Sequence, residues 1–100
     1  MTSTQQKIDA LMNIGAENLV EQTLQKLMEM QIVRYQSAIN EITAELTQFE
    51  QKFQMSSEEG YRRFQAGELG DSGDMVEWVS LYENILLYQQ RLQTLDATLS

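Results

Sequence analysis

The strongest constraint in this sequence is a heptad pattern that runs without a break through the middle of the chain. Its apolar residues follow one another in alternating steps of four and three: Met28, Ile32, Tyr35, Ile39, Ile42, Leu46, Phe49 and Phe53. Because an α-helix has about 3.6 residues per turn, this spacing puts all of these side chains along one seam. The pattern predicts a long helix over residues 17–54 that packs lengthwise against another helix.

A second seam follows in the last quarter of the chain. It consists of Trp78, Leu81, Ile85, Tyr88, Leu92, Leu95 and Leu99, again in steps of three and four. This seam predicts a C-terminal helix over residues 74–98. The chain has no proline, and four of its five glycines lie between the two seams, at Gly60, Gly67, Gly70 and Gly73. A glycine-rich stretch of this kind indicates that the chain reverses there.

Together the two seams predict an all-α fold in a single domain covering residues 1–100. We expect the long heptad helix and the shorter C-terminal helix to form an antiparallel coiled hairpin. A short connecting helix is expected over residues 57–66, since Ser56 and Glu59 have capping-box spacing and Gly67 can end the helix in a left-handed conformation. Another short helix is expected over residues 4–14.

The two long helices differ in length, and this difference leaves apolar surface uncovered. At 1.5 Å per residue the long helix spans roughly 55 Å, whereas the C-terminal helix reaches only about 39 Å. Proteins that stay monomeric rarely expose a large apolar patch. We therefore expect a homodimer in which two hairpins form a helical bundle. The alternative is a compact monomer whose short helices fold over both exposed surfaces.

The uncovered start of the long helix is the candidate binding surface. Its predicted partner-binding residues are Leu19, Val20, Leu24, Leu27, Met28 and Met30, together with Glu17 and Glu21. A partner helix would dock on the apolar residues by helix-in-groove recognition. The remaining seam residues, from Ile32 to Phe53 and from Trp78 to Leu95, are expected in the core or in a dimer seam.

Composition excludes most catalytic chemistry. The chain has no cysteine and no histidine, so it has no disulfide, thiolate nucleophile, zinc cluster or histidine-based triad of its own. The spacing of the carboxylates and lysines singles out no acid–base pair. The sequence therefore predicts a protein that is not an enzyme and has neither a cofactor nor a metal.

Charge narrows the class of partner. The chain has 15 acidic and 7 basic residues, which gives a net charge of −8. This charge opposes nucleic-acid phosphates and anionic membranes and favours a basic protein. The N-terminus resembles no secretion signal and the apolar runs are far too short to span a membrane, so a cytoplasmic location is expected.

The loop from Glu68 to Glu77 could supply carboxylates to a divalent cation, with Asp71, Asp74 and Glu77 as ligands. The spacing does not match a calcium-binding EF-hand loop. Capping of the following helix explains Asp71 and Asp74 without a metal. Helix capping is therefore the preferred interpretation.

Arg62 and Arg63 stand beside Tyr61 and Phe64, and such a basic and aromatic spot could contact nucleic acid. The net charge of −8 opposes this role. Two solvated arginines on a short helix are the preferred interpretation.

One stretch carries a family resemblance. The residues Gly67-Glu68-Leu69-Gly70-Asp71, then Asp74, then Glu77-Trp78, stand between two heptad helices. This arrangement resembles a group of small prokaryotic helical proteins often encoded beside toxin-like proteins. The resemblance implies the acidic, neutralising antitoxin of a toxin–antitoxin pair, with no catalytic residues. The alternative function is a homodimeric coiled-coil scaffold or chaperone-like holder without a dedicated toxin partner.

Overall fold

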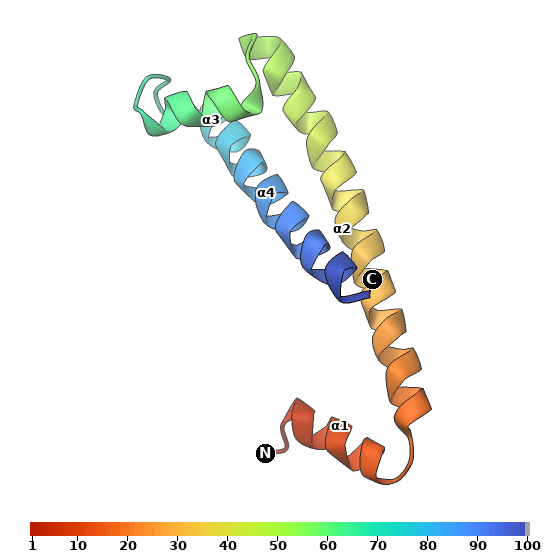
Figure 1. The fold of residues 1–100 in the computed structure, drawn as a ribbon. Helices are drawn as coiled ribbons and strands as arrows, with labels where there is room; N and C mark the ends of the chain where they lie inside the picture. The colour runs from red at the N-terminus through yellow and green to blue at the C-terminus, as the bar shows by residue number, and fades with distance from the viewer. Residues whose placement is uncertain (100) are drawn as a thin grey trace.

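The computed structural model describes residues 1–99, which contain four helices and no strand. The helices are α1 (Thr4–Asn13), α2 (Glu17–Phe53), α3 (Ser57–Gln65) and α4 (Gly73–Leu99). The long α2 packs against α4, which runs back along it, and α3 lies across the top of this pair (Figure 1). The predicted all-α hairpin with a short connecting helix is therefore confirmed.

Local signals in the sequence set the limits of α1. Ser3 caps its N-terminus in a full capping box, because the Ser3 Oγ accepts from the Gln6 amide and the Gln6 side chain accepts from the Ser3 amide. The helix stops before Gly15, whose φ of 86° lies in the left-handed region that favours glycine. The chain then turns, so that α1 and α4 lie on the same side of α2 (Figure 1).

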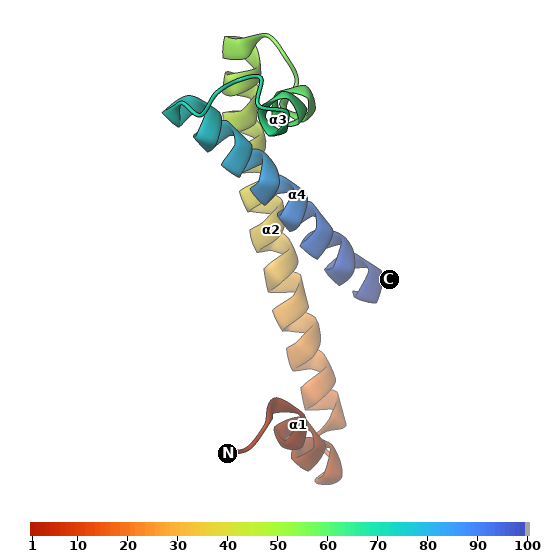
Figure 2. The same cartoon turned by 90° about the vertical axis from the view of Figure 1, so that its left-hand side faces the viewer.

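Contacts along the hairpin fix the register of α2 and α4. Near the closed end, Lys52 forms an ion pair with Asp74. Farther down, the rings of Tyr35 and Tyr88 lie 5.4 Å apart, and Arg91 donates to the Tyr35 hydroxyl at 3.4 Å. In this register the end of α4 falls short of the first turns of α2. Figure 2 also shows α4 crossing over α2, with its C-terminal half moving away from the α2 axis.

The core lies where α3 joins the hairpin, and Trp78 is its centre. Trp78 is 2% exposed, and its ring stacks on Phe53 with centroids 5.3 Å apart and on Phe49 at 6.2 Å. Its indole N–H donates to the Ser57 Oγ at 2.9 Å. The same hydroxyl donates to the Glu50 carboxylate at 2.7 Å, and Glu50 also accepts from the Ser57 amide. These bonds attach the start of α3 to both helices of the hairpin.

The N-terminus of α4 differs from its predicted capping. The Ser72 hydroxyl, not an aspartate, accepts from the Met75 amide, at 3.4 Å. Asp74 lies inside the first turn and pairs with Lys52 of α2. The expected capping role of Asp74 is therefore wrong, because its carboxylate faces a lysine across the hairpin.

The molecule is extended for its size. Its radius of gyration is 19.9 Å, whereas a compact domain of 100 residues has about 13 Å. Its accessible surface is 7348 Å², against about 5,800 Å² for a compact monomer of this mass. None of the helices in residues 1–99 is both long enough and apolar enough to cross a membrane.

Candidate functional site

The predicted seam residues face the interior of the hairpin to different degrees. Ile42, Leu46, Trp78 and Ile85 are buried. The others are half-buried: Ile32, Tyr35, Ile39, Phe49, Phe53, Leu81, Tyr88, Leu92 and Leu95. The fully buried members all lie in the half of the hairpin that α3 joins. Toward the open end the seam is only partly covered.

The predicted partner-binding residues do not form one surface. Leu19, Leu27, Met30 and Val33 are 61%, 52%, 52% and 63% exposed, and we call them the α2 strip. At about 100° per residue, Leu19 and Met30 lie within about 20° of each other around α2, with Leu27 and Val33 on either side. The strip lies on the side of α2 away from the seam. It includes Val33, which was not among the predicted binding residues.

The other three apolar residues of the predicted surface differ in exposure: Val20 is buried, Met28 is half-buried and Leu24 is exposed. Met28 is half-buried, and Leu24, one turn before it, is 41% exposed. Val20 is 8% exposed and lies at the end of α2 that α1 contacts. Val20 was predicted on the partner-binding surface, but its side chain is already buried within this chain.

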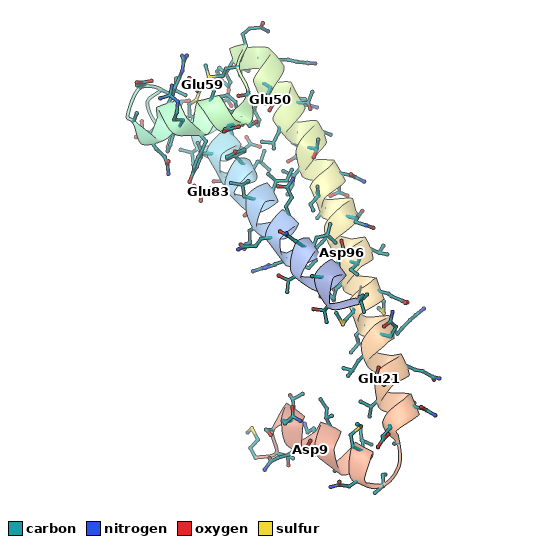
Figure 3. The ribbon with its side chains drawn as sticks, viewed as in Figure 1. Asp9, Glu21, Glu50, Glu59, Glu83 and Asp96 are labelled. Atoms are coloured by element: carbon teal, nitrogen blue, oxygen red, sulfur yellow. The ribbon has the colours of Figure 1, made fainter. Side chains whose placement is uncertain are left out.

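The predicted acidic neighbours are also displaced from the strip. Glu21 precedes Met30 by nine residues, which places it about 180° away around α2. Glu17 lies one turn before Glu21, on the same side of the helix. Glu21 lies on the part of α2 beyond the end of α4 (Figure 3). Glu17 and Glu21 therefore do not flank the exposed apolar residues, contrary to the predicted surface.

Two basic residues accompany the strip instead. Lys26, Met30 and Arg34 follow one another at four-residue intervals and form one ridge along α2, and Glu29 and Val33 form the next. These five residues line a shallow hollow of about 380 Å³, which we call the α2 groove. Lys26 and Arg34 were missed as site residues, although their four-residue spacing from Met30 can be read from the sequence.

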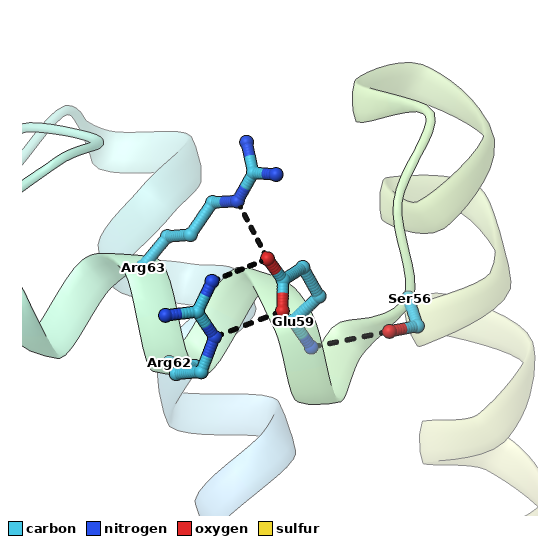
Figure 4. A network of polar contacts seen from close by, with 4 residues as sticks. All are labelled: Ser56, Glu59, Arg62 and Arg63. Carbon is cyan, nitrogen blue, oxygen red and sulfur yellow. Dashed lines mark hydrogen bonds and ion pairs between the residues drawn. The ribbon is translucent and has the colours of Figure 1, made fainter.

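The arginines of α3 are held by a carboxylate of the same helix (Figure 4). Arg62 donates to both Glu59 oxygens, at 2.9 and 2.6 Å, and Arg63 donates to one of them at 2.8 Å. The hydrogen bonds from Arg62 and then from Arg63 lower the pKa of Glu59 from 4.5 to about 2. Both guanidinium groups therefore have an anion within their own helix.

The carboxylates of the α3–α4 loop do not gather around a common point. Within residues 1–99, no group of three or more acidic side chains is arranged to hold a metal ion. Asp74 is instead engaged by Lys52, as described above. The acidic side chains labelled in Figure 3 are distributed along the whole molecule, from Asp9 on α1 to Glu59 on α3.

The α2 strip and the α2 groove are thus the features that distinguish the open end of the molecule. They combine exposed apolar side chains with two cations on one face of a single helix. A scan of the chain against protein-family models, a search of curated proteins and a search of solved structures each found no match.

Proposed function

We propose that this protein is a helical protein–protein interaction module that binds a partner on the α2 strip. The observation that carries the proposal is the exposure of Leu19, Leu27, Met30 and Val33, each more than half accessible. Burying one such side chain fully is worth about 1.5–3 kcal/mol. Leu27, Met30 and Val33 are neighbours at three-residue spacing, and Leu19 lies two turns before Leu27 on the same side of α2. Exposed apolar residues gathered on one helix face are typical of a surface that another protein covers.

The extended shape supports the same function. The chain exposes about 1,500 Å² more than a compact monomer of equal mass, by the difference between 7348 Å² and the expected value of about 5,800 Å². A standard protein interface removes about 800 Å² from each partner. The surplus surface is therefore large enough for one such interface. Binding, rather than catalysis, is the proposed role.

The biological setting that we propose is neutralisation of a toxin. The residues from Gly67 to Trp78 resemble those of small helical proteins encoded beside toxin-like proteins. The net charge of −8 would speed association with a basic protein by long-range attraction. Docking on the α2 strip would then hold the toxin in an inactive complex.

The alternative function is a homodimeric scaffold or chaperone-like holder. It is favoured by the open end of the hairpin, where Ile32, Tyr35, Leu92 and Leu95 are only half-buried. A second hairpin could cover these residues and complete a four-helix bundle. In that case the dimer would be the functional unit and its clients would be diverse.

The proposed function can be tested with the protein encoded by the neighbouring reading frame in the source genome. We expect the two purified proteins to form a complex of fixed stoichiometry, measured by calorimetry and light scattering. Leu27→Asp with Met30→Asp should weaken the complex at least 100-fold, because two carboxylates would enter an apolar contact. Leu87→Asp is the matched control, since Leu87 is 40% exposed on α4, away from the strip. Equal binding by the strip variant would refute the proposal.

A further inference from the structure

The shape of the α2 groove fits a helix. Its walls are two adjacent ridges of side chains at four-residue spacing, Lys26-Met30-Arg34 and Glu29-Val33. Packing a ridge of one helix into a groove of this kind is the commonest way in which two helices pack in globular proteins. The exposed Met30 and Val33 supply apolar contact within the groove. An extended strand would have no sheet edge to join here, because residues 1–99 contain no strand.

The groove contains two cations that form no ion pair in the part of the chain that the structure describes. Among residues 1–99, Lys52, Arg62 and Arg63 each pair with a carboxylate, and Arg91 donates to a tyrosine hydroxyl. Lys26 and Arg34 form no ion pair within that part of the chain, although the sequence has 15 acidic residues. Lys7 and Arg91 also form no ion pair among these residues, so the distinguishing feature of Lys26 and Arg34 is their position on one ridge, on either side of the exposed Met30.

The carboxylate in the groove does not neutralise this pair. Glu29 lies on the opposite ridge and accepts a hydrogen bond from Gln25 at 3.1 Å. Glu21, the next acidic residue toward the N-terminus, lies about 180° from Met30 around the helix, and it lines the adjoining hollow together with Lys26 and Glu29. The groove therefore keeps two positive charges against one negative charge. Lys26 and Arg34 are eight residues apart, which is about 12 Å along α2.

We propose that the α2 groove receives an acidic amphipathic helix of the partner protein. The apolar face of that helix lies on Met30 and Val33. Two carboxylates about two turns apart on that helix pair with Lys26 and Arg34. This inference rests on the proposed function and specifies the chemistry of the docking element. The net charge of −8 attracts a basic protein over long distances, whereas Lys26 and Arg34 attract carboxylates at the contact itself. A partner that is basic as a whole but docks through an acidic helix meets both conditions.

A second copy of this chain fits the groove less well. A two-fold axis through the groove would bring the same residues of both chains together. Lys26 and Arg34 of one copy would then lie close to Lys26 and Arg34 of the other, with two Glu29 side chains against four cations. Like charges at close quarters in an interface oppose binding. The cations therefore favour a different, acidic helix as the occupant.

Two synthetic helical peptides test the inference directly. Both carry leucines at positions i, i+3, i+4 and i+7. One has glutamates flanking this face two turns apart, and the other has lysines at the same positions. We expect the intact protein to bind the glutamate peptide about tenfold more tightly than the lysine peptide, as measured by fluorescence anisotropy at low salt. The difference should shrink as salt is added, because exposed charges are screened.

Charge reversal in the protein provides the decisive comparison. Lys26→Glu with Arg34→Glu should invert the order of the two peptides, and far-UV circular dichroism should show unchanged helicity because both residues are exposed. Lys7→Glu on α1 is the matched control, because it changes charge outside the groove, and it should keep the order of the intact protein.

Three results would overturn the inference: equal binding of the two peptides, no binding of either, or an order that the double reversal leaves unchanged. A solution dimer that Met30→Asp dissolves would show that a second copy occupies the groove, and this would also overturn it. These failures differ from failure of the proposed function, in which Leu27→Asp with Met30→Asp leaves the complex with the neighbouring gene product intact.

Discussion

The two ends of the hairpin carry similar apolar side chains but pack them very differently. At the closed end Trp78 is 2% exposed and is covered by Phe49, Phe53 and α3. At the open end Leu19 and Val33 are more than 60% exposed. The difference lies in the third helix. At the closed end α3 contacts both helices of the hairpin, whereas α1 contacts only α2 among the other helices.

This contrast explains why the candidate site lies where it does. Two helices cover only one seam between them, so any further apolar face needs a third element. The closed end has such an element in its own sequence. The open end has α1, which leaves the α2 strip bare. The proposed interaction surface therefore lies where the intramolecular packing stops.

The largest expected effect comes from breaking the closed end. Trp78→Ala removes the ring that stacks on Phe49 and Phe53 and deletes the donor to Ser57. We expect a loss of about 3–5 kcal/mol in the free energy of unfolding, measured by urea denaturation. Leu87→Ala, at the 40% exposed Leu87 of α4, should cost far less. Equal losses would mean that Trp78 is packed no more tightly than a 40% exposed residue of α4.

The second effect concerns Gly60, whose substitution tests how closely α3 approaches the hairpin. A Cβ atom at Gly60 would lie 2.4 Å from the Trp78 ring. Gly60→Ala should therefore destabilise the protein by about 1–3 kcal/mol, although alanine normally favours helices over glycine. Gly73→Ala is the control, because a Cβ there meets nothing within 4 Å. Thermal unfolding of the two variants measures the difference, and a stabilising Gly60→Ala would refute the close packing.

A substitution in the α2 strip should reduce partner binding and leave the stability of the isolated protein almost unchanged. Met30→Asp changes a side chain that is 52% exposed, so we expect the free energy of unfolding to change by no more than about 0.5 kcal/mol. The same variant should lose partner binding. Urea denaturation of the isolated protein, compared with calorimetry of the complex, separates the two effects. A large loss of stability would show that Met30 supports the fold instead of a partner.

The hairpin could be predicted because its signal is local and periodic. Steps of three and four residues determine which side chains share a helix face, and the seams from Met28 to Phe53 and from Trp78 to Leu99 satisfy this rule throughout. The glycine-rich break between them then requires a reversal. The same arithmetic also separates Glu21 from Met30 by half a turn. That error in the predicted surface could have been avoided without a structure.

Other features depend on contacts between distant residues, which periodicity does not encode. Gly60 lies inside α3, as the predicted helix over residues 57–66 requires, but the sequence gives no sign that Gly60 allows the close approach of Trp78. Val20 was assigned to a partner, although coverage of the exposed surfaces by the short helices was the alternative, and Val20 is buried at the end of α2 that α1 contacts. Glu59 has capping-box spacing from Ser56, and the Ser56 hydroxyl does accept from the Glu59 amide. The Glu59 carboxylate, however, binds Arg62 and Arg63.

The smallest expected effect is the pH dependence that Glu59 confers on the closed end. Its pKa is lowered from 4.5 to about 2 by hydrogen bonds from Arg62 and Arg63. Because the folded state favours the ionised form, the contribution of Glu59 to stability is fully present above about pH 4.5 and is lost as the pH falls toward 2. We expect the difference in Tm between the wild-type protein and Glu59→Gln to shrink over this range, as measured by circular dichroism. The effect should be small and should weaken in high salt, since these arginines and their carboxylate lie near solvent.

Glu58→Gln, one residue earlier on α3, is the control. Glu58 forms no ion pair with an arginine among residues 1–99. A Tm difference for Glu59→Gln that stays constant from pH 6 to pH 2 would show that the two arginines do not stabilise α3 through this carboxylate.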